Sequence, residues 1–381
     1  MQHFYFDHNA TTAVSPEVLE AVLPCLDQAY GNASSIHHFG QIAKQRLEQA
    51  RRQVAALLNC DPREIVFTGG GTEADNMAVL GAACGHIITS AIEHTAVLSP
   101  CAHLERHGVA VTRVRASADG IVDPDDVRRA LRPQTSLISI MHANNELGTI
   151  QPIAEIAKIA HAAGVLFHAD GVQALGKTPV DVQALGVDLY TISGHKIYAP
   201  KGAGALFVRK GVKLGPILFG GHHERDRRPG TENVAGAVGL GAGAEWLARN
   251  QQGESARVAA LRDRLERGIL ARVGDVAVNG AGALRTSNTS NIRFDFIEGE
   301  ALVIALDLRG FAVSSGAACS SGAVEPSHVL LAIGLAPDAA RSSIRFSLGR
   351  WNTVEQVDAL VDAVAESVAH LRRIAPVRAH V

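Results

Sequence analysis

A lysine and an aspartate, each directly after a predicted β-strand, have the clearest chemical potential in this chain. Lys196 follows the apolar run VDLYTIS in the segment SGHKIYAPKG, and Asp170 ends the run VLFHAD. A desolvated lysine at a strand end can form a Schiff base with a carbonyl compound. A buried carboxylate can pair with a positively charged ring nitrogen. Each residue also has an ordinary explanation, a solvated surface lysine or a cap for the next turn.

A glycine-rich turn supplies a third chemical feature. Gly69, Gly70, Gly71 and Thr72 follow the predicted strand EIVFT and precede a helical pattern. Such a turn lets backbone N–H groups and the positive end of a helix approach a phosphate. The same segment fits a dinucleotide-binding pattern with Glu93 as the ribose acid, or a simple connecting turn. A phosphate site, a ring-nitrogen partner and an aldehyde-binding lysine are together the requirements of pyridoxal 5′-phosphate, whereas a dehydrogenase leaves Lys196 without a role.

A second phosphate-loop pattern is rejected on physical grounds. Residues 171–178, GVQALGKT, fit GxxxxGK[ST] and follow a predicted strand. A nucleotide-binding P-loop requires a helix that begins at its Lys-Thr pair. Pro179 follows Thr178 directly and biases it towards extended geometry. We therefore do not expect a nucleoside triphosphatase.

Further polar residues could surround such a cofactor. His94 begins a helical pattern in IEHTAVL, where an imidazole could stack on a ring and move protons. Gln173 lies three residues after Asp170, within reach of a ring oxygen, and Asn145 occupies a strand-end loop. Arg345 interrupts the apolar strand SSIRFSL, where a two-pronged grip on a substrate carboxylate would justify it.

The five cysteines divide into two groups. Their odd number and the absence of a CxxC pair argue against a disulfide framework or a structural zinc site. Cys25, Cys60, Cys84 and Cys101 lie in helical or helix-end contexts, so we expect them to pack as small hydrophobes. Cys319 lies in the Ser/Gly/Ala-rich run SSGAACSSGAVEPSH, typical of an exposed loop. It is the candidate nucleophile.

The elements that position these residues follow an alternating order. Between residues 60 and 210, short apolar runs alternate with helical patterns, which predicts βαβ units and a largely parallel sheet covered on both faces. Upstream, residues 15–31 are expected to form one helix, with Ser15 as its cap. From about residue 254 a long charged helix, short strands and a closing helix predict a separate α+β lobe. We expect a large domain over 13–253, and a small domain over 1–12 and 254–381.

Composition excludes several classes of protein. The chain has 381 residues, 47% hydrophobic and 19% charged, which describes a globular rather than a disordered protein. A net charge of -2 without basic or acidic blocks indicates neither nucleic acid nor a membrane surface as partner. The segment MQHFYFDHNATT has no targeting pattern, and no apolar run is long enough for a membrane span. A cytoplasmic location is the expectation.

Taken together, the motifs resemble a known family. The segments run in order from about residue 4 to 352: YFDHNATT, GNASSIHHFG, EIVFTGGGTEADN, IEHTAVL, HANNELGTIQPI, FHADGVQALGK, SGHKIYAPKGAGAL, GGHHERDRRPGTEN, EGEALVIAL, SSGAACSSGAVEPSHVL and SSIRFSLGR. They resemble cysteine desulfurases of the NifS/IscS type, which are class V aminotransferases. The resemblance implies a fold-type-I pyridoxal-phosphate-dependent transferase, with a mostly parallel seven-stranded sheet in its large domain. The family commonly has Pro at Ala33, Ser at Gly69 or Gly70, and Ala at Gly171.

The resemblance also implies a role for each site residue. Lys196 would bind the cofactor aldehyde, Asp170 its ring nitrogen, Gln173 its ring hydroxyl, and His94 would stack on the ring and shuttle protons. The phosphate would be held by Gly71, Thr72, Ser193 and His195, and by Thr231 of a neighbouring subunit, so the site would require a homodimer. Asn145 and Arg345 would bind the carboxylate of L-cysteine.

Cys319 is the implied nucleophile. It would attack the substrate sulfur, leave alanine as product, and carry a persulfide to an acceptor or scaffold protein for iron-sulfur cluster assembly. Cys319 would also be a transient cluster ligand shared with that scaffold. Two alternatives stay open: an aminotransferase or lyase of the same fold, such as a selenocysteine lyase, in which Cys319 is dispensable, and a sulfur-relay or scaffold protein with a vestigial site.

Overall fold

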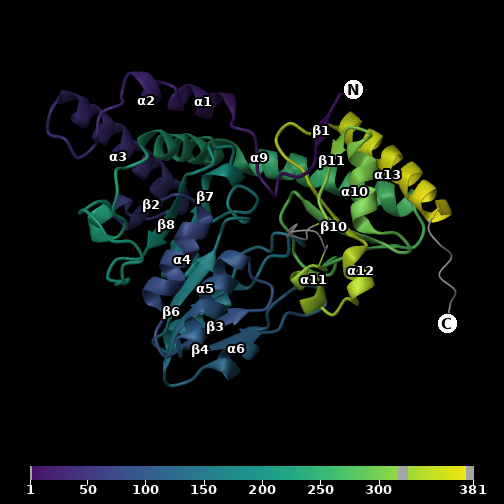
Figure 1. Ribbon diagram of the computed structural model, residues 1–381, viewed down its shortest axis with the longest axis horizontal. Coiled ribbons are helices and arrows are strands. Elements are labelled where there is room, and N and C mark those ends of the chain that lie inside the picture. The colour runs from purple at the N-terminus through teal and green to yellow at the C-terminus, as the bar shows by residue number, and fades with distance from the viewer. Residues whose placement is uncertain (1, 316–324, 375–381) are drawn as a thin grey trace.

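Seven strands form the central sheet of the protein, seen here in a computed structural model that describes residues 2–315 and 325–374 (Figure 1). Their spatial order is β2-β8-β7-β6-β5-β3-β4. All neighbouring pairs are parallel except those made by β8, which is antiparallel to both β2 and β7. The strands are β2 (Ile65–Thr68), β3 (His86–Ser90), β4 (Ala110–Val114), β5 (Thr135–Ser139), β6 (Leu166–Asp170), β7 (Leu189–Ser193) and β8 (Gly204–Val208). The predicted mostly parallel sheet is confirmed.

Helices cover both faces of this sheet, and the strand residues show why. Alternate side chains of a strand point to opposite faces, and Ile65 and Phe207 join one apolar cluster while Val66 and Leu206 join another. Helices α4 (Gly71–Ala82) and α5 (Thr95–Arg106) pack on the face that carries Val66 and Leu206. The face that carries Ile65 and Phe207 is covered by α3 (His38–Leu58), α6 (Pro124–Ala130), α7 (Ile153–Ala162), α8 (Val182–Leu185) and α9 (Val234–Arg272).

Two helix predictions are wrong in their extent. The expected single helix over 15–31 is divided into α1 (Pro16–Val22) and α2 (Pro24–Asp27), because Pro24 has no N–H group to continue the ladder. Ser15 precedes α1 without a side-chain capping hydrogen bond. Helix α9 begins at Val234, well before the charged pattern that starts near residue 254.

Glycines explain the early start of α9. Glycine disfavours an isolated helix, but here it permits close packing, since a Cβ at Gly241 would lie 2.7 Å from Cα of Ala50 on α3. The contact between α3 and α9 therefore depends on a missing side chain. Figure 1 shows α9 running from the large sheet into the second lobe.

The second lobe is built on a small antiparallel sheet with the order β12-β10-β9. Its strands are β9 (Val276–Val278), β10 (Thr289–Phe294) and β12 (Ser343–Ser347), and β1 (Phe4–Tyr5) pairs separately with β11 (Phe311–Ala312). Its helices besides α9 are α10 (Gly299–Asp307), α11 (His328–Ala332), α12 (Pro337–Arg341) and α13 (Val354–Ile374). A distinct apolar cluster joins Phe6 to Leu265, Phe346 and Val364. We propose the division 13–253 against 1–12 and 254–381 as the domain boundary, although α9 passes through it without a break.

Four cysteines lie in the described part of the chain, and all are free thiols. Cys25 and Cys101 are buried in apolar clusters and Cys60 packs beside one, as predicted. The prediction for Cys84 is wrong, because it follows α4 in an exposed connection to β3. Within residues 2–315 and 325–374, no helix is long and apolar enough to cross a bilayer.

Candidate functional site

The carboxyl ends of the parallel strands meet at one edge of the large sheet, and the predicted site residues gather there. Asp170 and Ser193 are the last residues of β6 and β7. A short 3-10 turn, η2 (Gly194–Lys196), then brings Lys196 back over this edge. Because β2 also runs parallel to β7, the turn from Thr68 into α4 opens at the same edge. Ligands of open α/β sheets bind at such an edge.

Lys196 lies against the N-terminal segment rather than in open solvent. Its Nζ donates hydrogen bonds to the carbonyl oxygens of Asn9 at 2.5 Å and Ala10 at 2.8 Å. Burial, reinforced by the Arg345 charge, lowers the pKa of Lys196 to about 8, while Asp7 and Asp170 act in the opposite direction. A substantial neutral fraction near physiological pH makes this amine a competent nucleophile and base.

Asp170 is buried at the end of β6, where its Oδ1 accepts a hydrogen bond from the Val172 N–H at 2.9 Å. Burial raises the pKa of Asp170 above its usual value. Asp75, also buried, has a pKa raised first by burial and further by the charge of Asp170. Two buried carboxyl groups in one region would be stabilised by a cation, which a protonated ring nitrogen would supply.

His94 caps α5 from the end of the turn after β3. Its Nδ1 accepts a hydrogen bond from the Ala96 N–H at 3.1 Å, so the neutral ring carries its proton on Nε2. The preceding Glu93 is fully buried and accepts hydrogen bonds from Ser90 Oγ and the Met141 N–H. It cannot meet a ribose, which removes the dinucleotide interpretation of the Gly69 turn.

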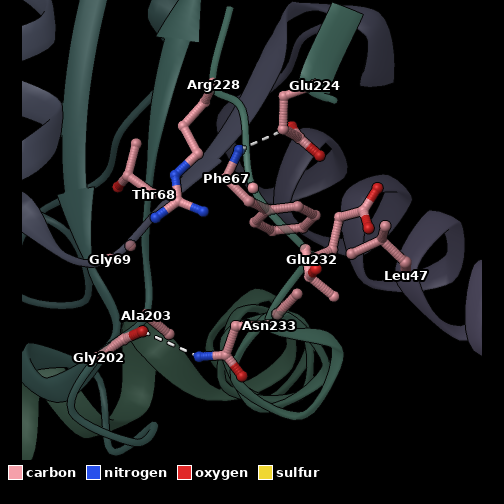
Figure 2. Close-up of a pocket in the computed structure, with 14 residues that line it drawn as sticks. Leu47, Phe67, Thr68, Gly69, Gly202, Ala203, Glu224, Arg228, Glu232 and Asn233 are labelled. Atoms are coloured by element: carbon pink, nitrogen blue, oxygen red, sulfur yellow. Dashed lines mark hydrogen bonds between the residues drawn. The ribbon is translucent and has the colours of Figure 1, made fainter. Parts of the chain in front are cut away.

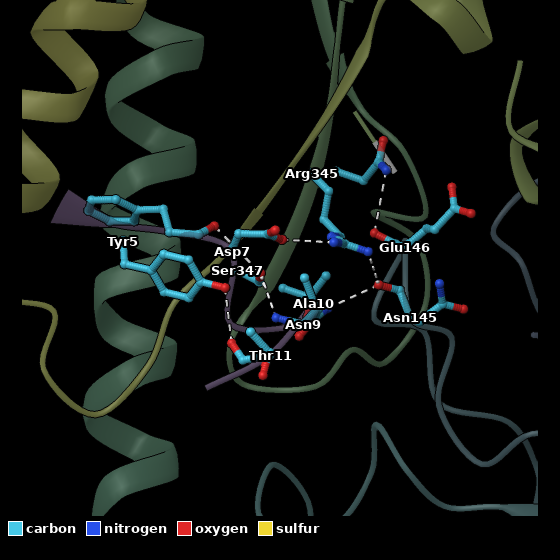
Figure 3. Close-up of polar contacts among 12 residues, drawn as sticks. Tyr5, Asp7, Asn9, Ala10, Thr11, Asn145, Glu146, Arg345 and Ser347 are labelled. Atoms are coloured by element: carbon cyan, nitrogen blue, oxygen red, sulfur yellow. Dashed lines mark hydrogen bonds and ion pairs between the residues drawn. The ribbon is translucent and has the colours of Figure 1, made fainter. Parts of the chain in front are cut away.

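Arg345 projects from β12 of the second lobe towards the sheet edge. Figure 3 shows its guanidinium between Asp7 and Asn145: Nη2 pairs with Asp7 Oδ1 at 2.8 Å, and Nη1 donates to the Asn145 carbonyl at 3.1 Å. Asn9 Nδ2 donates to the same carbonyl at 3.0 Å. Among the described residues, Arg345 Nε and Asn145 Oδ1 are buried with no hydrogen-bond partner. The Arg345 Nε–H group could donate to a carboxylate, whereas Asn145 Oδ1 is an acceptor and could meet only a donor such as an amino group.

A hollow at the start of α4 is the candidate phosphate site. Gly71 and Thr72 begin this helix and line one hollow with Ser193 and His195. A Cβ at Gly71 would lie 2.8 Å from Val172 Cγ2, so a side chain would close the cradle. Ser193 Oγ is buried without a partner in the part of the chain that the structure describes. With N–H groups, a free hydroxyl and no side chain at Gly71, the residues present fit pyridoxal phosphate.

The outer wall of this region carries Thr231. It is exposed in the segment before α9 and lines a pocket with Gly69 and Gly202. Figure 2 shows this pocket, with Arg228 directed towards the Thr68–Gly69 turn. Arg228 Nε also forms an ion pair with Glu73 Oε1 at 2.8 Å. A neighbouring subunit's Thr231 at the phosphate stays a prediction.

Cys319 lies outside the described residues. Throughout residues 2–315 and 325–374, no cluster of three or more His, Cys, Asp or Glu could hold a metal ion. The rejected P-loop pattern forms a turn without a helix at Lys177, and the next helix is α8.

Comparison with known proteins places the chain in a family. Residues 4–360 match the family described as Aminotransferase class-V. A cysteine desulfurase of Gluconacetobacter diazotrophicus is 49% identical in an alignment of length 383, and the alignment covers 99% of this chain and 96% of that protein. The chain belongs to the cysteine desulfurases. This family uses pyridoxal phosphate.

Solved structures agree with this family and its fold. A NifS-like protein has a TM-score of 0.91 at 34% identity, over 97% of this chain and 100% of that one. A structure described as SspA in complex with cysteine has a TM-score of 0.82 at 36% identity, over 92% of this chain and 99% of that one. The fold-type-I architecture of a cysteine desulfurase is therefore shown.

The sequence interpretation missed several residues at the site of this desulfurase. Asp7 and Asn9 contact Arg345 and Lys196 from the N-terminal segment, and Lys177 contacts Gln173. Lys177 belongs to the rejected P-loop pattern, and Asp7 and Asn9 lie in YFDHNATT, whose only signal is its part in the resemblance. Nothing local in YFDHNATT indicates which distant residues its carbonyl and carboxylate groups meet.

Proposed function

We propose that the enzyme removes sulfur from L-cysteine, forming L-alanine and a persulfide on Cys319. The observation that carries this proposal is the convergence of Lys196, Asp170 and Arg345 on one sheet edge. Lys196 has a lowered pKa, Asp170 is buried, and Arg345 Nε has no hydrogen-bond partner among residues 2–315 and 325–374. An amine, a carboxyl group and a guanidinium in these states suit an α-amino acid bound to pyridoxal phosphate.

Each of the site residues would have a separate role. Lys196 would hold the cofactor aldehyde, Asp170 its ring nitrogen, and Gly71, Thr72, Ser193 and His195 its phosphate. Burial, reinforced by Lys196, lowers the pKa of His195 to about 4, so it would act as a neutral donor or acceptor at physiological pH. When bound, pyridoxal phosphate stabilises negative charge at the substrate Cα.

Substrate binding would use hydrogen-bond donors beside β12, which are Nε of Arg345 and the side-chain NH2 group of Asn145. Arg345 and Asn145 would hold the carboxylate of L-cysteine, and Asp7 would fix the guanidinium plane from the opposite side. Lys196, as a neutral amine, would take the proton from the substrate Cα. His94, with its proton on Nε2, would shuttle protons at the same edge.

Sulfur transfer would then involve Cys319. Its thiolate attacks the substrate sulfur, so an S–S bond forms as the substrate C–S bond breaks. The electron pair of the C–S bond stays on carbon, which takes up protons to give L-alanine, and the second sulfur remains on Cys319. An acceptor or scaffold protein would take this sulfur for iron-sulfur cluster assembly, with the cluster as cargo.

We propose that the functional unit is a homodimer. Thr231 is exposed beside the phosphate cradle of its own subunit, where it could be presented to a second copy. Large apolar side chains are exposed at Tyr30, Ile36 and Phe219, which is unfavourable unless another surface covers them.

The test is a paired assay of the wild type and Cys319→Ala, with alanine and sulfide measured from L-cysteine in the presence of a thiol. We expect both proteins to have the visible absorbance of bound cofactor, and only the wild type to turn over. Cys84→Ala removes an exposed thiol and is the matched control, with full activity expected. Full turnover by Cys319→Ala would instead favour a lyase or an aminotransferase.

A further inference from the structure

Lys177, the lysine of the rejected P-loop pattern, is directed into the candidate site. It follows Asp170 in a compact turn, in which the Leu175 N–H donates to the Gly171 carbonyl and the Lys177 N–H to the Ala174 carbonyl, both at 3.0 Å. This turn places Lys177 Nζ against the side chain of Gln173, and Nζ donates a hydrogen bond to Gln173 Oε1.

The Gln173 amide is therefore held at both ends. Its Nε2 donates to the Asn9 carbonyl at 3.0 Å, while its Oε1 accepts from Lys177. A flipped amide would place Oε1 against the Asn9 carbonyl and would lose the hydrogen bond that Lys177 Nζ donates to Oε1, so one orientation is strongly preferred. An amide NH2 group has two hydrogens, and the Asn9 carbonyl uses one of them.

We infer that Lys177 is a positioning residue that fixes the amide of Gln173 with its N–H end available to the cofactor ring oxygen. This inference rests on the proposed function, in which Gln173 binds that oxygen. Lys177 touches neither substrate nor cofactor in this assignment, and acts only through Gln173.

The charged surroundings of Lys177 are consistent with a neutral donor. Lys196 and Arg345 both act on it as positive charges, and burial together with these charges lowers its pKa well below the usual value. His8, which faces it from the N-terminal segment, has its pKa lowered to about 4 by burial and by Lys177. A neutral amine still donates to Gln173 Oε1, so the arrangement does not require a buried cation.

The experiment compares the holoenzyme with Lys177→Met, which keeps an unbranched side chain without the donor. The readout is the pH midpoint of the visible absorbance change of the bound cofactor. A hydrogen bond donated to the cofactor ring oxygen stabilises the negative charge on that oxygen. It therefore favours loss of the proton next to that oxygen and lowers the pH midpoint of the absorbance change. Misorienting Gln173 should therefore raise this midpoint by about one pH unit, a tenfold change in the protonation equilibrium.

A double-mutant cycle separates the indirect role from a direct one. Gln173→Ala should raise the midpoint similarly, and adding Lys177→Met to it should change nothing further. Lys158→Met removes an exposed lysine on α7 and should leave the midpoint unchanged. If Lys177→Met does not fold, Lys177→Gln, with a shorter donor, should give a smaller rise.

Three outcomes overturn the inference. An unshifted midpoint in Lys177→Met, or in Lys177→Gln where that variant replaces it, shows that Gln173 needs no support from residue 177. A shift that persists in the Gln173→Ala background shows that Lys177 acts directly. A wild-type protein without a visible band overturns the proposed function, and this inference with it, before any variant is compared.

Discussion

Tyr190 fills the space that a side chain at Gly171 would occupy. A Cβ at Gly171 would lie 2.0 Å from Tyr190 Cζ and 2.4 Å from its hydroxyl oxygen. The Tyr190 ring is fully buried, and its hydroxyl is 2.7 Å from His142 Nδ1. Since Gly171 directly follows Asp170, this contact also fixes the backbone beside the candidate cofactor site.

This relationship predicts that Gly171→Ala destabilises the protein, although related enzymes commonly have alanine there. Overpacking of a buried contact costs about 1–3 kcal/mol, because neither the strand that carries Tyr190 nor the turn after Asp170 can move freely. The free energy of unfolding by denaturant measures the effect. Combining Gly171→Ala with Tyr190→Val should cost less than the sum of the two single changes, and strict additivity would contradict the proposed clash.

The lowered pKa of Lys196 predicts how cofactor capture depends on pH. Only the neutral amine attacks an aldehyde, so the rate at which the apoprotein takes up pyridoxal phosphate should rise with pH and level off above about 8. Stopped-flow absorbance measures this rate.

Asp7→Asn gives the matching prediction for the same amine. The Asp7 carboxylate raises the pKa of Lys196, so its removal should lower the midpoint of the rate profile and speed capture at pH 7. A midpoint near the ordinary lysine value of about 10.4 in the wild type would contradict the burial of this amine.

A buried ion pair fixes the segment that leads to Thr231. Arg51 Nη2 and Nη1 lie 2.6 and 2.8 Å from the two carboxylate oxygens of Glu224, and both side chains are almost fully buried. Glu224 Oε2 also accepts from the Phe67 N–H at 2.9 Å (Figure 2). Arg51→Met leaves Glu224 uncompensated and should lower the free energy of unfolding by about 3–5 kcal/mol.

Arg52→Met is the matched control for this ion pair. Arg52 is the exposed neighbour on α3 and bonds to Gln49 at 2.7 Å, so its loss should change stability by less than about 0.5 kcal/mol. Equal losses in the two variants would show that the helix, rather than the ion pair, determines the effect.

The proposed homodimer makes a complementation prediction. Lys196→Ala and Thr231→Ala subunits should each form weakly active or inactive homodimers. In a mixed dimer, one site would combine an intact Lys196 with the Thr231 of the other subunit, so mixing and reassembly should restore activity. Activity after mixing that equals the average of the separate variants would contradict a shared site.

Much of the site could be predicted from the sequence because it depends on strand ends. Asp170, Ser193 and Lys196 come directly after apolar runs, and parallel strands bring their carboxyl ends to one edge. The turn after β2 and the capping position of His94 follow from similar local patterns. These features can be predicted from the hydrophobic periodicity of short segments and from the residues at their ends.

The tertiary structure decided how these residues are held. Lys196 contacts Asn9, Arg345 contacts Asp7, and Tyr190 lies beside Gly171. In each pair, the local sequence around one residue does not indicate that the other will lie next to it. Helix α9 also begins within a glycine-rich stretch because α3 packs closely against it, which overrides local helix propensity. The sequence alone determined which groups reach the sheet edge. Only long-range packing decided their partners and protonation states, since burial and neighbouring charge depend on the whole fold.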